Sequence, residues 1–245
     1  MLGDSHCFVA NLSLACLNEE ERHILYPRWG GIEAGATLSD YFRIMWEPVN
    51  VNNQEKQLVH RCYIDSDDEK DHGCLTRAQD HTEGSICFIK DYMKGDLDDS
   101  YTEDQFLENL GMFLGIACHH IADLCTPVHV GHNINFFKIG FNTLSKFHKQ
   151  VERDILRYQR KARIELHVPK IVQINKHYFK QIASQTYKNQ FLKLCDIYQS
   201  KDPSILLEMI SGVLSSAVKH TASAWHTVLV KSKMTDRSWS MQPLL

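Results

Sequence analysis

The chain lacks several features that would assign it to a class at once. No apolar run approaches the about 20 residues that a membrane-spanning helix needs, although 43% of the sequence is hydrophobic. No charge of one sign dominates, since the formal net charge is −3 at pH 7, so a general attraction to nucleic acid or anionic membrane is not expected. With 245 residues, the chain is long enough to bury its own core.

Paired cysteine motifs are also missing. The sequence holds eight cysteines, and none falls in a CxxC pair. Cys118 and Cys125 lie seven residues apart on a predicted helix, where small buried side chains are expected. Cys62, Cys74 and Cys87 lie in a polar stretch and can form disulfides in an oxidising compartment.

The apolar spacing is helical almost throughout and predicts an all-α fold, a single compact multi-helix domain over residues 1–245 with a loose tail at 233–245. The first helix is expected to start near His6, capped by Asp4 or Ser5. Further helices are predicted over 85–93, 103–123, 143–166, 171–199 and 203–232, the last opening on Asp202-Pro203. Residues 48–84 are predicted to form a loop, and Gly30, Gly31 and Gly35 to punctuate the chain before it.

Two segments place a histidine and a carboxylate four residues apart, His119 with Asp123 and His148 with Glu152. Positions i and i+4 lie on one face of a helix, so each pair can bind a single cation. Zinc accepts this mixture of nitrogen and oxygen ligands. His129 follows just after Pro127, which ends the predicted helix that carries His119 and Asp123. The spacing predicts a multinuclear metal site built on helices, and the other histidines are expected to make ordinary hydrogen bonds.

The run His-x-x-x-Asp-x-x-x-Pro-x-His from His119 to His129 resembles the signature of the zinc-dependent phospholipase C and single-strand nuclease superfamily. The resemblance spans most of the chain and implies an all-helical enzyme with a cleft for three zinc ions. Eight residues match the family's side-chain ligands in type, order and rough spacing: His6, Asp40, His60, His119, Asp123, His129, His148 and Glu152. Met1 stands at the position of the family's N-terminal ligand.

The resemblance also implies how these ligands divide. One zinc would be bound by Asp40, His60, His119 and Asp123. A second would be bound by His129, His148 and Glu152, with a position open to water. The third would be bound by His6, Asp123 and the amino nitrogen and carbonyl oxygen of Met1, so that Asp123 bridges two ions. Asp40 is the implied general base.

The chain departs from the family pattern in three places. Family members usually begin with a tryptophan exposed by signal-peptide cleavage, whereas this sequence begins with Met1. His120 stands where tyrosine is common, and His132 stands where asparagine often follows His129. His120 and His132 are candidates for supporting or extra ligands, with a packing role favoured for His120.

The function implied is a phospholipase C that releases diacylglycerol and a phosphorylated head group by attack of a zinc-bound hydroxide at a membrane surface. Glu152 as the last ligand, the compact length and the lack of a basic groove favour this branch. A single-strand nuclease or 3′-nucleotidase of the same superfamily is the alternative, and a non-catalytic helical metal-binding protein is the second. The family is secreted or periplasmic, yet the start of the chain lacks the basic and apolar stretches of a signal peptide, which indicates a cytosolic protein or a mature form.

Overall fold

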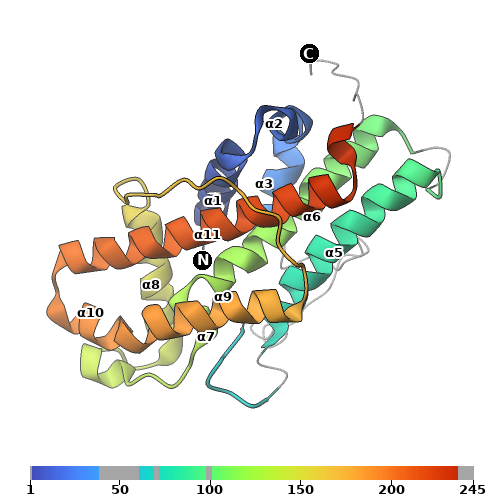
Figure 1. The fold of residues 1–245 in the computed structure, drawn as a ribbon. Coiled ribbons are helices and arrows are strands. Elements are labelled where there is room, and N and C mark those ends of the chain that lie inside the picture. The colour runs from blue at the N-terminus through green and yellow to red at the C-terminus, as the bar shows by residue number, and fades with distance from the viewer. Residues whose placement is uncertain (1, 39–60, 69–71, 98–100, 237–245) are drawn as a thin grey trace.

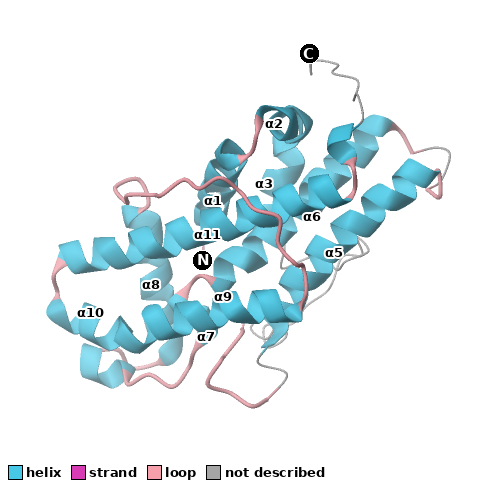
Figure 2. Ribbon diagram, in the orientation of Figure 1, coloured by secondary structure: helices cyan, strands magenta, loops and turns pink. Residues whose placement is uncertain are grey.

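The computed structural model describes residues 2–38, 61–68, 72–97 and 101–236, and in these ranges the chain is helical with no β-strand (Figure 2). The prediction of an all-α fold is confirmed. No helix in the described part combines the length and apolar character needed to cross a membrane.

The elements follow one another along the chain as in Figure 1. The α-helices are α1 (Gly3–Cys16), α2 (Glu19–Leu25), α3 (Trp29–Leu38), α5 (Gly73–Lys94), α6 (Glu103–Leu124), α7 (Pro127–Val130), α8 (Leu144–Tyr158), α9 (Lys176–Asn189), α10 (Leu194–Ser200) and α11 (Pro203–Lys231). Short 3₁₀ turns are η1 (Tyr26–Arg28), η4 (Phe136–Ile139), η5 (Phe191–Lys193) and η6 (Met234–Asp236).

Helix α6 is the centre of the core, and every residue from Phe113 to Leu124 is buried. It packs against α3 and α5, and also against α1 and α11. The indole of Trp225 on α11 donates a hydrogen bond to the carbonyl of Leu114 at 3.0 Å. At its start, Thr102 and Gln105 form a reciprocal capping box. Because α6 carries the His119–Asp123 pair, it places that pair in the middle of the molecule.

The glycines expected to punctuate the chain are instead part of α3, and that prediction was wrong. A Cβ built on Gly35 would lie 2.1 Å from the carbonyl oxygen of Met112, and one on Gly115 would lie 2.2 Å from that of Ile32. Side chains cannot occupy such space, so the glycines allow the backbones of α3 and α6 to touch. Their role is close helix packing, which outweighs the low helix propensity of glycine.

Other boundaries also differ from the predictions. Helix α5 begins at Gly73, so residues 73–84 are helical and not loop. Helix α8 ends at Tyr158 and not near Leu166. The predicted first helix begins earlier, at Gly3, with Leu2 at the cap position. The start of α11 is as predicted, with the Asp202 carboxylate accepting from the amide of Ser204 at 2.8 Å.

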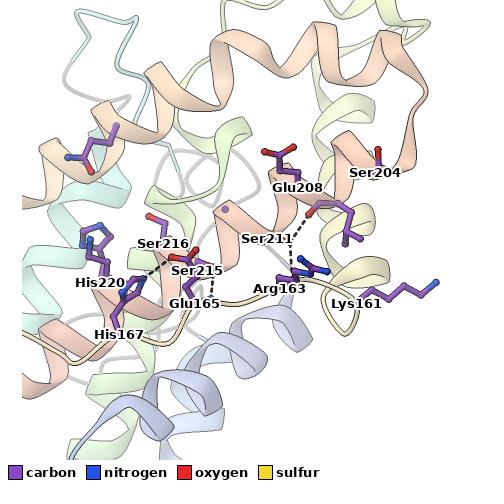
Figure 3. A pocket seen from close by; sticks show the side chains of 14 residues that line it. Lys161, Arg163, Glu165, His167, Ser204, Glu208, Ser211, Ser215, Ser216 and His220 are labelled. Atoms are coloured by element: carbon purple, nitrogen blue, oxygen red, sulfur yellow. Dashed lines mark hydrogen bonds and ion pairs between the residues drawn. The ribbon is translucent and has the colours of Figure 1, made fainter.

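Residues 159–175 join α8 to α9 and run along α11; we call them the strap (Figure 1). Hydroxyls of α11 accept hydrogen bonds from strap amides: Ser211 from Arg163, Ser215 from Glu165, Ser223 from Lys170 and Thr227 from Val172. The first two of these contacts are drawn in Figure 3. The strap is thereby held without a partner strand.

The predicted loose tail lies mostly outside the described residues. Its first part differs from the expectation, because Met234 is fully buried within η6.

Candidate metal centre

His6, His119 and Asp123 form what we call the inner group. His6 comes from α1, and the other two come from neighbouring turns of α6. Their ligand atoms all lie within 4.8 Å of one another, and all three residues are buried. His6 Nε2 lies 3.5 Å from Asp123 Oδ1, and His119 Nε2 lies 3.4 Å from Oδ2. The two imidazoles stack at 3.9 Å between ring centroids, so both face the same carboxylate.

The orientation of His119 is fixed from the other side of its ring. Its Nδ1 lies 2.9 Å from the carbonyl oxygen of Ala36 at the end of α3. A carbonyl only accepts, so Nδ1 carries the proton and Nε2 presents its lone pair to the inner group. A backbone contact of this kind is how proteins orient metal-binding histidines. The α3–α6 contact thus serves the site directly.

His129, His148 and Glu152 form the outer group. His148 and Glu152 lie one turn apart on α8, and His129 lies on α7. Glu152 Oε1 lies 3.3 Å from His148 Nε2 and 3.5 Å from His129 Nε2. The side chain of His148 is 27% exposed and that of Glu152 is 13% exposed, whereas Asp123 is fully buried. The outer group is therefore the end of the centre that solvent reaches.

His129 joins the two groups. Its Nε2 lies 3.6 Å from Asp123 Oδ1 as well as close to Glu152. Six of the eight predicted side-chain ligands therefore meet in one continuous cluster. The spacing-based prediction that both i,i+4 pairs belong to a common site agrees with this geometry.

Protonation in the cluster suits cation binding. Burial lowers the pKa of His129 to about 4, so the imidazole is neutral near pH 7. Burial would raise the pKa of Asp123, but the surrounding histidines, His129 first, hold it well below its usual range. Neutral imidazoles and ionised carboxylates are the forms that bind metal.

The distances also fit metal ligands better than hydrogen bonds. An N–H···O bond typically spans about 2.7–3.2 Å. Two nitrogen or oxygen ligands of a tetrahedral zinc with bonds of about 2.0–2.1 Å stand about 3.3–3.4 Å apart. The five nitrogen–oxygen separations given above for the cluster run from 3.3 to 3.6 Å. The donor set and its spacing therefore fit divalent cations.

Several predicted residues are not part of this arrangement. Met1, Asp40 and His60 lie outside the described residues, so the first and third zinc sets, to which they belong, and the role of Asp40 as general base stay predictions. His132 bonds elsewhere, with its Nδ1 3.0 Å from Asp65 Oδ1. Asp65 also accepts from the backbone amide of Asn133, so it fixes the turn after α7.

One cysteine and one of the remaining histidines form a donor group that the sequence did not predict. All eight cysteines are free thiols, and Cys118 and Cys125 are buried as predicted. Cys74, however, groups with His120 and Asp123, and all three are buried. The sequence offered no signal for this group, because Cys74 was assigned to a loop and lies 46 residues from His120.

The described part of the chain also holds hollows apart from the cluster. One of about 430 Å³ lies between α1 and α8 and is lined by Asp4, Cys7, Phe8, Asn11, Trp29, Leu156, Gln159 and Arg160. The other, of about 810 Å³, lies between the strap, α9 and α11, and its labelled side chains are mainly serines and mixed charges (Figure 3). No predicted ligand lines either hollow.

The sequence matches no protein-family model, and no curated protein matches it significantly. The geometry of the cluster is therefore the main support for assigning a function.

Proposed function

We propose that this protein is a zinc-dependent phosphodiester hydrolase of the phospholipase C type, acting at the inner and outer groups. The observation that carries this is the convergence of six predicted ligands from α1, α6, α7 and α8 on one cluster. A scaffold needs only one closed zinc site, with four ligands. Two adjacent groups that share a bridging histidine–carboxylate contact are more typical of hydrolytic centres, where neighbouring cations act on one phosphate.

The residues of the chain have distinct parts in this proposal. His6, His119 and Asp123 would hold cations at the buried end, and His129, His148 and Glu152 would hold one at the exposed end. Bound zinc would neutralise the phosphodiester charge and lower the pKa of water to about 7. Ala36 would keep His119 oriented through its carbonyl. The substrate would approach from the outer group, where His148 meets solvent.

Aromatic surface beside an acid in the smaller hollow supports a lipid head group as substrate, although Arg160 also lines this hollow and no ligand of the cluster does. Leu156, in its lining, lies one helical turn beyond Glu152 on α8. Trp29 and Phe8 supply aromatic surface there, and Asp4 supplies a negative charge. Aromatic faces with a nearby acid suit a quaternary ammonium group. We infer a choline-type phospholipid, with single-stranded nucleic acid as the alternative substrate.

Metal content and hydrolysis test the proposal together. The protein, with its N-terminus verified by mass, is expected to carry about three zinc ions and to hydrolyse a chromogenic phosphodiester. Exhaustive chelation should abolish turnover, and added zinc should restore it. Turnover that survives chelation would refute the mechanism. Bound zinc without hydrolysis of any phosphodiester would leave the protein as a non-catalytic metal binder.

Substrate class is tested with short-chain phosphatidylcholine and a single-stranded oligonucleotide. Trp29→Ala is expected to raise the KM for phosphatidylcholine about tenfold, because a cation–π contact contributes about 0.5–2 kcal/mol. Its KM for a chromogenic phosphodiester without a head group should not change. The matched control is Tyr26→Ala, since Tyr26 is 70% exposed and does not line the hollow. Preferential cleavage of the oligonucleotide would select the nuclease branch.

A further inference from the structure

A third donor group lies behind the inner group and contains sulfur. Cys74 lies near the start of α5, and His120 follows His119 on α6. Cys74 Sγ is 3.9 Å from His120 Nδ1. The sulfur, one ring nitrogen of His120 and one oxygen of Asp123 all lie within 4.8 Å of one another. All three residues are buried, with Cys74 and Asp123 completely inaccessible.

His81 provides a second, independent observation. It lies two turns after Cys74 on α5, and its side chain is completely buried. Neither of its ring nitrogens has a hydrogen-bond partner in the described part of the chain. Its ring lies nearly parallel to that of His120, at 5.9 Å between centroids. The expectation that His81 would be satisfied by ordinary hydrogen bonds is therefore wrong, and a buried imidazole of this kind needs another explanation.

The simpler explanation for Cys74 is a buried thiol that donates to a carbonyl. Its Sγ does lie 3.2 Å from the carbonyl oxygen of His120, and burial raises the pKa of the thiol well above its ordinary value. That contact accounts for Cys74 but not for His81. A tetrahedral cation with bonds of about 2.3 Å to sulfur and 2.0–2.1 Å to nitrogen sets these ligands about 3.5 Å apart. The observed 3.9 Å is close to this value.

We propose that Cys74, His120 and Asp123 form an additional binding site for a borderline-soft divalent cation such as zinc, with His81, whose ring stacks beside that of His120, as the candidate fourth ligand. A carboxylate has two oxygens and about four lone-pair directions, so Asp123 can serve this site and the inner group. On binding, the Cys74 thiol releases its proton to solvent and the thiolate bonds the cation. The site stands independently of the hydrolase proposal, because it concerns ligation and not turnover.

Cobalt is a suitable probe, because thiolate ligation to Co²⁺ gives a near-ultraviolet charge-transfer absorption that imidazole and carboxylate do not. Metal-free protein is titrated with Co²⁺, and the band is expected to grow until one cation is bound at this site, in addition to those that the inner and outer groups take up. Cys74→Ser should remove the band, and His120→Asn should weaken cation binding at this site. The matched control is Cys118→Ser, another fully buried thiol that belongs to none of the three donor groups. It should keep the band.

X-ray absorption of the zinc-loaded wild-type protein checks the site without any variant, since a sulfur neighbour is expected at about 2.3 Å. Absence of both the cobalt band and this sulfur neighbour would overturn the assignment. Persistence of the band in Cys74→Ser would overturn it too, because another cysteine would then be the ligand. If the protein shows the band but hydrolyses no phosphodiester, the assignment of this site stands and only the proposed function is refuted.

Discussion

The inner and outer groups use the same chemistry in different surroundings. The inner group is completely buried around Asp123 and is fixed by α1, α3 and α6. The outer group lies on α7 and α8, and both His148 and Glu152 retain contact with solvent. Burying a carboxylate is costly unless it is compensated, so the inner group should depend most on cations for its stability. The outer group is the part that can exchange its ligands with substrate.

The largest effect is expected for Asp123→Asn, because this carboxylate contacts both groups. The variant should lose at least two metal equivalents and all measurable hydrolysis, as measured by elemental analysis and phosphodiester turnover. Asp154→Asn is the matched control, since Asp154 is also buried but bonds Gln150 and Tyr198. If Asp123→Asn kept the wild-type metal content, Asp123 would not bridge cations, and the proposed difference between the inner and outer groups would be contradicted.

A smaller and more local effect is expected for Glu152→Gln. It weakens the outer group only, so one metal equivalent should be lost while the inner group keeps its own. Turnover should fall strongly, because the exposed end of the centre is affected. Glu165→Gln, on the exposed strap, serves as the control. If Glu152→Gln lost as many ions as Asp123→Asn, the two groups would be one indivisible site.

Stability should respond to Gly115→Ala, which tests how the inner group is positioned. The added methyl would lie 2.2 Å from the carbonyl oxygen of Ile32 and force α3 and α6 apart. Overpacking of this kind costs about 1–3 kcal/mol of unfolding free energy. The control is Gly212→Ala on α11, where the nearest atom lies at 3.5 Å and alanine should stabilise the helix by up to about 1 kcal/mol. Denaturant unfolding measures both, and equal stability of the two variants would argue against the close contact.

At neutral pH the smallest effect is expected for a residue away from both groups, because it acts only as the pH falls. Burial lowers the pKa of His220 to about 4, with Lys219 and His167 adding to the shift. The unfolded chain therefore binds a proton between about pH 6.5 and 4 that the folded chain does not, and stability falls as the pH falls. In metal-free protein this contributes about 1.4 kcal/mol per pH unit. His220→Gln should flatten the slope, whereas the surface variant His177→Gln should not; an unchanged slope would assign acid sensitivity elsewhere.

The sequence predicted the parts of the site that lie within single helices. His119 with Asp123, and His148 with Glu152, are determined by helical periodicity alone. His6 was predicted to be a ligand only from the order and spacing of the family's ligands. The Cys74 group could not be predicted, because it joins two helices through tertiary packing and α5 begins inside a polar stretch that indicated a loop. The glycines of α3 were misread for a similar reason, since only the neighbouring helix explains them.

The hydroxyls of α11 are spaced so that they can bind an extended segment, the strap, at regular intervals. Four helical residues advance about 6.0 Å and two extended residues about 6.6 Å, so the two repeats nearly match. Ser211 and Ser215, four residues apart on α11, accept from strap amides two residues apart, and so do Ser223 and Thr227. Between them, eight helical residues span about 12 Å while five strap residues could span about 16 Å. The surplus length bows outward, which explains why Leu166 and Val168 are 56% and 86% exposed.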